Sequence, residues 1–146
     1  MKNVLTVMVA AVMLAAQPAG ILASQGQTQA GTVKVTVTYK GKAGQVDASH
    51  KLWVWLFDNP NIGPGSQPID QIALDKNGAD AVFQVSTGAV YVAVAFDEKG
   101  GMDGQGPPPP GTPISILADA KGVPVAVTPG PKAAISLTFD DTVRMP

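Results

Sequence analysis

Beyond residue 30 the chain is divided into short apolar segments, which are separated by Gly, Pro, Asn and Asp. The clearest segment is residues 32–40, where Thr and Lys alternate with Val33, Val35, Val37 and Tyr39. Such alternation places the apolar side chains on one face, which is typical of a half-buried antiparallel strand. No segment in this part of the sequence repeats its apolar residues at the helical spacing of about 3.6 residues. We therefore expect an all-β domain.

Seven or eight segments are expected to form strands, namely residues 32–40, 52–57, 69–74, 81–85, 89–96, 114–117, 123–127 and 133–139. They recur roughly every 10–15 residues with turn signals between them, a pattern that favours an antiparallel Greek-key β-sandwich. Asn77 and Gly78 form a strong hairpin signal, because an Asn-Gly pair readily supplies positive φ angles. We therefore expect the strands on either side of this pair to lie next to each other.

The start of the chain has the features of a signal peptide. Lys2 precedes an apolar run at residues 4–16, Pro18 interrupts the sequence after it, and small residues at 23 and 24 suit cleavage. The run of about 13 residues is shorter than the roughly 20 that a membrane-spanning helix needs, so an uncleaved anchor is the alternative. The expected organisation is a signal peptide at residues 1–24, a polar tether at 25–30 and a domain at 31–146. This predicts a periplasmic or secreted protein with no membrane span after cleavage.

The composition narrows the class of partner. The chain has no cysteine and a formal net charge of −1. An exported domain of about 120 residues without disulfides must be held together by its core alone, which is feasible at this size. The weak acidic balance, with no basic cluster, argues against nucleic acid and anionic membrane surfaces. We expect the partner to be a protein or a glycan.

An acidic, glycine-rich loop at residues 97–111 follows the expected strand at 89–96 directly. Its carboxylates and backbone carbonyls would suit calcium, which accepts six to eight oxygen ligands in a flexible cage. The candidate metal ligands are Asp97, Glu98 and Asp103, with Asp58 from the end of another strand. The spacing differs from that of a 12-residue calcium loop, because Lys99 and Gly101 stand at ligand positions. The alternative is a solvated loop whose acidic residues keep it soluble.

Two further features could form a surface for a ligand or partner. Trp53 and Trp55 stand two residues apart in an expected strand, so they share a face. If exposed, they would form a platform for a sugar ring or a partner's side chain; the alternative is burial beneath the proline-containing loops. An extended polyproline II segment, which aromatic grooves bind, is expected at Pro107, Pro108, Pro109 and Pro110. Alternatively, these prolines stiffen a long connection and cover a sheet edge.

Catalytic residues are sparse. His50 is the single histidine, which excludes a metal site with two histidines. It follows Ser49 in a polar turn, but no serine lies in a nucleophile-elbow motif. Asp140 and Asp141 are paired in sequence, yet neighbours on a strand point to opposite faces. We expect no enzyme activity and no catalytic residue; a hydrolase is the catalytic alternative.

Residues 88–98 begin with Gly88, continue through Tyr91 and an apolar run, and end with Asp97 and Glu98. This stretch resembles the late strand of transthyretin-like sandwiches, which include carboxypeptidase-regulatory-like domains of exported bacterial proteins. The segment Gly31–Val35 is similar in style to their first strand. The resemblance implies that the later strand completes a sheet. The hydroxyisourate-opening enzymes of this superfamily rely on several histidines and a Tyr-Arg-Gly-Ser terminus. This chain has one histidine and ends Val-Arg-Met-Pro, so that activity is not expected to carry over.

Together these features predict a non-catalytic exported module for binding or structural support that uses the loop at residues 97–111. The rival prediction is a calcium-dependent adhesion or carbohydrate-binding domain, in which the loop carboxylates hold the ion and the tryptophans meet sugar. A cofactor other than calcium is not expected.

Overall fold

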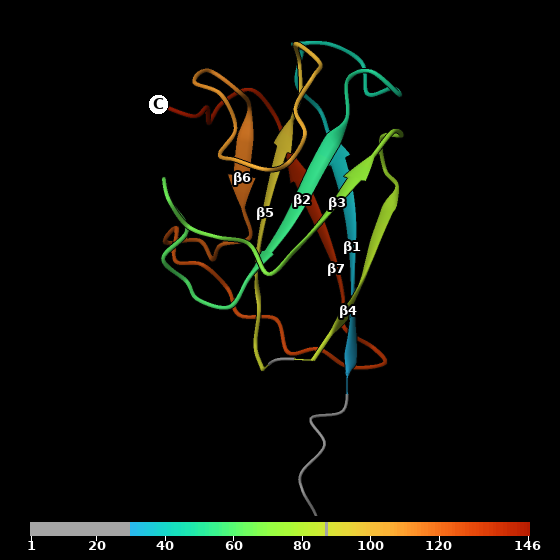
Figure 1. Cartoon of the computed structure of the whole chain (residues 1–146), viewed down its shortest axis with the longest axis vertical. Coiled ribbons are helices and arrows are strands. Elements are labelled where there is room, and N and C mark those ends of the chain that lie inside the picture. Colours follow the sequence, from blue (N-terminus) through green and yellow to red (C-terminus); the bar gives the residue numbers. More distant parts are fainter. Residues whose placement is uncertain (1–29, 87) are drawn as a thin grey trace, which may run out of the picture.

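The computed structural model describes residues 30–86 and 88–146, so the expected signal peptide lies outside the described residues. Seven strands follow one another along the chain (Figure 1): β1 (Gly31–Tyr39), β2 (Leu52–Phe57), β3 (Asp70–Leu74), β4 (Asp80–Val85), β5 (Tyr91–Phe96), β6 (Ile114–Ile116) and β7 (Ala134–Phe139). The described residues contain no helix, and hence none that could span a membrane. The expected all-β class is confirmed for this part of the chain.

The strands form two sheets, with the orders β4-β1-β7 and β3-β2-β5-β6. Their arrangement is consistent with a β-sandwich. All pairings are antiparallel except that of β1 with β7, which is parallel. The expected antiparallel pairing therefore holds for four of the five strand pairs, and β1 with β7 departs from it. The parallel pair arises because the chain leaves the four-stranded sheet after β6, crosses to the other sheet and enters beside β1 in the same direction.

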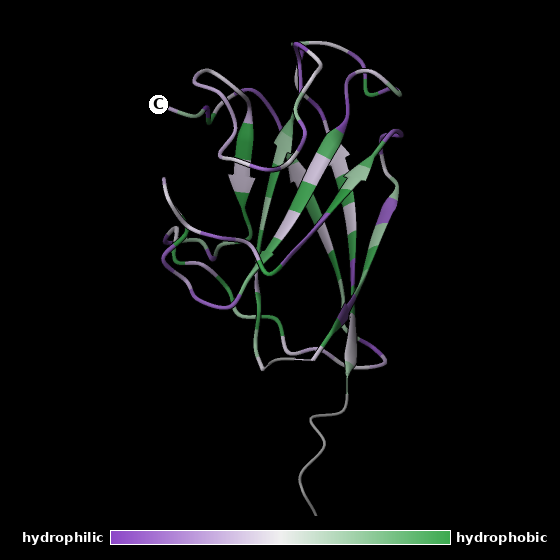
Figure 2. Cartoon of the chain, viewed as in Figure 1, coloured by the Kyte–Doolittle hydropathy of each residue, from purple (hydrophilic) through white to green (hydrophobic). Residues whose placement is uncertain are grey.

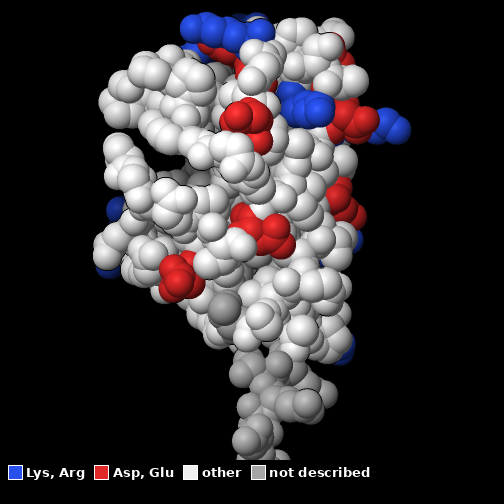
Figure 3. All heavy atoms as spheres, in the orientation of Figure 1, with Lys and Arg blue, Asp and Glu red and all other residues white. Residues whose placement is uncertain are grey.

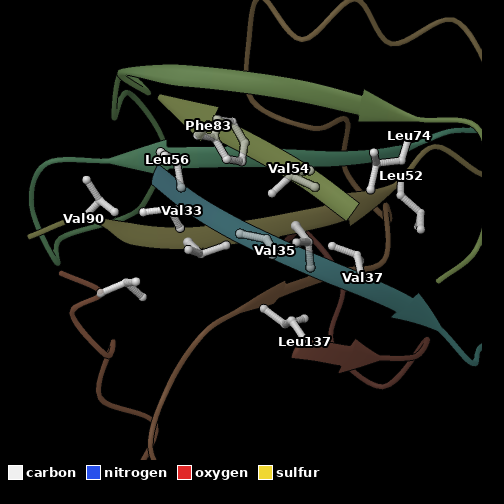
Figure 4. Packing of buried hydrophobic residues seen from close by; sticks show 14 of the residues in the cluster. Val33, Val35, Val37, Leu52, Val54, Leu56, Leu74, Phe83, Val90 and Leu137 are labelled. Carbon is white, nitrogen blue, oxygen red and sulfur yellow. The ribbon is translucent and has the colours of Figure 1, made fainter. Parts of the chain in front are cut away.

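The main core lies between the two sheets. Val33, Val35 and Val37 of β1 are completely buried there, as the alternation in the sequence predicts. Figure 4 shows these valines beside Phe83 of β4 and Leu137 of β7, which belong to the same sheet, with Leu52, Val54 and Leu56 of β2 from the other sheet in the same core. Colouring by hydropathy shows apolar residues concentrated in the strands and polar ones in the connecting turns (Figure 2). β2 is buried on both faces, so it contributes to this core and to a second apolar layer outside the sheet.

The turn at residues 75–78 connects the two sheets, so the predicted hairpin between the flanking strands is wrong. β3 pairs with β2, whereas β4 pairs with β1. Gly78 does adopt the positive φ of 76° that an Asn-Gly turn requires. The Asn77 side chain, however, hydrogen bonds both the N–H and the C=O of Tyr39 at 2.7 Å. The turn is thereby fastened to the end of β1, and β4 continues along that strand.

Residues 123–127 form isolated bridges where the sequence predicted a strand. Val90 pairs with Val127, and Ala118 pairs with Pro124. A regular ladder is interrupted here because proline has no N–H to donate. The other expected strands are present with shifted ends; β5, for example, begins at Tyr91.

Tyr39 joins the two sheets to the C-terminal segment. Its ring stacks on that of Phe96, with centroids 4.3 Å apart. Its hydroxyl donates a hydrogen bond to the Asp141 carboxylate, which also accepts one from the N–H of Lys42 at 2.6 Å. Burial, followed by the bond to Asp141, raises the pKa of Tyr39 to about 12. The same hydroxyl, followed by the Lys42 N–H, lowers the pKa of Asp141.

We expect Tyr39→Phe to reduce the free energy of unfolding by about 1–2 kcal/mol near neutral pH, because a hydrogen bond to a charged group is lost. The lowered pKa of Asp141 stabilises the fold at pH values above the ordinary carboxyl pKa of 3.8, and this contribution disappears as the pH falls below that value. A raised tyrosine pKa stabilises the fold below the ordinary value of 10.0, and this contribution disappears as the pH rises toward about 12. The difference between the two proteins should therefore shrink below pH 4 and above pH 10. Urea unfolding across this range measures it, and a difference that stays constant at acidic pH contradicts the expected coupling.

Candidate functional site

The outer face of the four-stranded sheet is apolar. Its side chains lie in two cross-strand rows, Gln71–Trp55–Ala93–Ile116 and Ala73–Trp53–Ala95–Ile114, and in the further pair Phe57–Tyr91. The two indole rings stack with centroids 6.0 Å apart and planes inclined by 17°. Wide rings on β2 beside alanines on β5 create a stepped surface. A bare apolar surface of this kind is unfavourable in water, so it requires a cover or a partner.

The loop that follows β5 supplies part of that cover. Asp97 is buried, and its Oδ2 accepts a hydrogen bond from the N–H of Met102 at 2.8 Å. This bond turns the chain back over the sheet, where Met102 packs against the tryptophan layer. Gly104 is buried with a positive φ of 75° and lies directly against Trp53. The first half of the 97–111 loop is therefore a lid on the sheet and not a projecting tip.

The lid decides between the two interpretations of the tryptophan pair. Trp53 is 8% exposed and Trp55 is 5% exposed, so an exposed stacking platform is ruled out and the alternative of burial holds. Nε1 of Trp55 donates a hydrogen bond to Oε1 of Gln71 at 3.1 Å. Nε1 of Trp53 is buried and has no partner among the described residues.

The connection between β2 and β3, residues 58–69, forms a second wall beside the sheet. The Ser66 hydroxyl accepts a hydrogen bond from the N–H of Gly63 and donates one to the C=O of Asn61, both at 2.9 Å. These bonds make the loop compact and independent of the sheet edge. Ile62 turns inward and packs against the tryptophan layer.

A cleft of about 510 Å³ lies between the two loops. Residues 62–71 line one side and residues 104–108 the other, and the floor is the outer face of the sheet at Trp55, Phe57, Ala93, Ile114 and Ile116. Figure 3 shows a hollow on this face that is bordered by uncharged residues. Asp70 is the single charged side chain among the described residues that line the cleft. The volume falls within the roughly 300–1,000 Å³ that is usual for small-ligand sites.

The C-terminal segment closes one end of the cleft. Its backbone pairs with the residues before β6: the N–H of Met145 donates to the C=O of Thr112 at 2.9 Å. The Arg144 guanidinium lies 3.1 Å from the Glu98 carboxylate and also bonds the C=O of Gly111. These contacts bring Met145 and Pro146 to the cleft, where both contribute to its lining.

The carboxylates that the sequence suggested for calcium are engaged separately. Asp97 holds the lid, Glu98 pairs with Arg144, and Oδ1 of Asp103 accepts a hydrogen bond from the N–H of Gln105 at 2.9 Å. Oδ1 of Asp58 accepts one from its neighbour Asn59. Within residues 30–86 and 88–146, no group of three or more acidic or histidine side chains is arranged to hold a metal ion. Calcium binding remains a prediction from the sequence alone.

The four prolines differ in their surroundings. Pro107 and Pro108 line the cleft, and Pro108 is half-buried. Pro109 and Pro110 are exposed and lead into the segment before β6. The run is thus part of the wall of the cleft as well as a connection.

The residues considered for catalysis lie outside the cleft. Oδ1 of Asp47 accepts hydrogen bonds from the N–H groups of His50 and Ser49, and these bonds lower the pKa of Asp47. His50 Nδ1 lies 3.0 Å from the same oxygen, so this exposed carboxylate closes a turn. Asp140 accepts a hydrogen bond from the N–H of Thr142, whereas Asp141 bonds Tyr39. The two neighbouring carboxylates therefore serve different turns.

Sequence reasoning missed the cleft and the part that the 58–69 connection and the C-terminal segment play in it. One signal was present: Ile62 and Met102 are apolar residues within otherwise polar, glycine-rich loops. Such residues indicate loops that fold back onto an apolar surface. Comparison of the chain with protein-family models, curated proteins and solved structures finds no match.

Proposed function

We propose that the protein is a non-catalytic, exported β-sandwich module that binds an apolar ligand in the cleft between residues 62–71 and 104–108. The observation that supports this is an open cleft of about 510 Å³ over an aromatic sheet face. Among the described residues that line it, Asp70 is the single one with a charged side chain. Concave, mostly apolar sites with a few polar groups are the usual form of ligand sites. The surface in use then extends from the 97–111 loop to the facing 58–69 loop.

The lining favours an apolar ligand over a sugar. A sugar ring stacks on the exposed face of an aromatic ring, whereas both indoles here are buried. Isoleucine, proline and glycine supply most of the lining, while Ser66 and Gln105 stand in the loops that form the walls. Apolar groups entering the cleft would gain roughly 25 cal/mol for each Å² removed from water.

We also propose that the sandwich is of the transthyretin-like, Greek-key type. The support is the segment from Gly88 to Glu98, together with the position of its strand β5 inside the four-stranded sheet between β2 and β6. A location in the periplasm or outside the cell follows from the expected signal peptide, and cell fractionation tests it.

An uncharged fluorescent probe, N-phenyl-1-naphthylamine, tests the proposed site. We expect its emission to rise and shift to the blue with the mature protein, because the probe enters an apolar cleft. Gly63→Trp and Gly106→Trp should each weaken binding by at least tenfold, because both positions line the cleft and have open space for a side chain. Neither glycine has a positive φ, so the backbone accepts the change.

Gly130→Trp is the matched control, since Gly130 also has open space and an unrestricted φ but does not line the cleft. It should bind the probe as the natural protein does. The probe is excited directly and not through tryptophan, because each variant contains an added tryptophan. The natural protein and the three variants are then measured in the same way. Absence of probe binding, or equal binding by all three variants, would refute the proposed site.

A further inference from the structure

The strand that borders the cleft, β6, has an outer edge that is only partly paired. The N–H of Phe96 donates to the C=O of Pro113, and the N–H of Leu117 donates to the C=O of Val92, so the odd-numbered residues face β5. The even-numbered residues face away, as the bond from the N–H of Ile114 to the C=O of Val143 shows. By the same alternation, both backbone groups of Ile116 face outward. No hydrogen bond to either group is found among the described residues.

The C-terminal segment leaves this edge open for an identifiable reason. It pairs with the chain up to Ile114 and would have to continue through residue 141 to reach Ile116. The Asp141 carboxylate instead accepts hydrogen bonds from the Tyr39 hydroxyl, at the end of β1, and from the N–H of Lys42. The segment therefore diverges from β6 at Val143, and the lower half of the edge has no strand beside it.

Strand β6 borders a hollow on each face of its sheet. On the outer face, residues 114–116 line the cleft. On the inner face, Ile114, Ser115 and Val143 line a second hollow of about 260 Å³. Figure 1 shows β6 at the margin of its sheet, with the C-terminal segment beside its upper end. Ile116 is half-buried, so its edge is available to a partner.

We propose that the ligand of the cleft is an extended peptide of a partner protein, which adds as a strand to the β6 edge at Ile116. This rests on the proposed function and names its ligand class. Strand addition uses backbone hydrogen bonds for affinity and pockets for alternate side chains for selectivity. The C-terminal segment already demonstrates that this edge accepts a strand, and the added peptide continues that pairing. Its apolar side chains enter the cleft, and the alternate side chains, which point away from the cleft, are polar.

A capped heptapeptide of alternating lysine and valine is a suitable probe, and calorimetry or fluorescence anisotropy measures its affinity. In a strand, the valine N–H groups face one edge and the lysine N–H groups the other. Two N-methylated forms, one at the valine and one at the lysine nitrogens, keep every side chain and block one edge each. We expect one form to lose at least tenfold in affinity and the other to bind within threefold of the parent.

Ile116→Pro tests the edge from the protein side. Proline removes the outward N–H but leaves the pairing with β5, which uses the odd-numbered residues, intact. Ile116→Ala is its control, because it removes the same side chain and keeps the N–H. The proline variant should bind the lysine–valine peptide about 3- to 10-fold more weakly than the alanine variant, as expected for one lost hydrogen bond. The two variants should bind N-phenyl-1-naphthylamine equally.

The outcomes separate the two proposals. If the naphthylamine probe binds and the peptide does not, strand addition is wrong and the apolar site stands. Strand addition is also wrong if both methylated peptides bind equally. If neither probe nor peptide binds, the proposed site itself is wrong.

Discussion

Replacing Gly104 by alanine should lower the free energy of unfolding by about 2–5 kcal/mol, through backbone strain and overpacking against the tryptophan layer. Gly104 has a φ of 75°, a region that costs a residue with a side chain about 1–2 kcal/mol. A Cβ there would also overlap the indole ring of Trp53 and the Gln71 side chain. Overpacking of this kind typically costs a further 1–3 kcal/mol. Equilibrium unfolding in urea measures the change, and tryptophan emission should shift to the red as the lid lifts.

Gly101→Ala is the matched control for the lid. Gly101 lies in the same loop with a φ of 94°, but nothing lies within 4 Å of the position of its Cβ. This variant should lose only the backbone contribution, about 1–2 kcal/mol, and should keep its emission maximum. Equal losses in the two variants would mean that Gly104 is not in close contact with Trp53.

Phe83→Ala should lower the free energy of unfolding by about 3–5 kcal/mol, because it removes a large side chain from a close-packed interior. Phe83 is 1% exposed and stands opposite Val33 in the pairing of β4 with β1. Small domains are stable by only about 5–15 kcal/mol, so this substitution should remove a large fraction of the total. Thermal and urea unfolding of the purified variant measure it.

The neighbouring residue gives the control for Phe83. Val82 is 50% exposed and points to the opposite face of β4, so Val82→Ala should cost less than about 1 kcal/mol. Comparable losses at the two positions would contradict the orientation of β4 in the three-stranded sheet.

Local patterns in the sequence were sufficient to predict seven of the eight expected strands and the buried face of β1. Val33, Val35 and Val37 alternate with polar residues, and period-two alternation has one structural meaning wherever one face is buried. The unbroken apolar segment of β2 allowed burial on both sides but left an exposed tryptophan platform open as well. Both signals are local, because they depend on the geometry of neighbouring residues within one strand.

Only the tertiary structure decided which strands pair and what covers the sheet. The turn at Asn77 reads as a hairpin in isolation, but its side chain bonds Tyr39, which is 38 residues away in sequence. Contacts between residues distant in sequence also form the lid over Trp53, which Gly104 contacts. They likewise leave the edge at Ile116 partly open, because Asp141 bonds Tyr39. A sequence specifies which side chains must leave water, whereas the choice among several apolar surfaces that could bury them is made by contacts between distant parts of the chain.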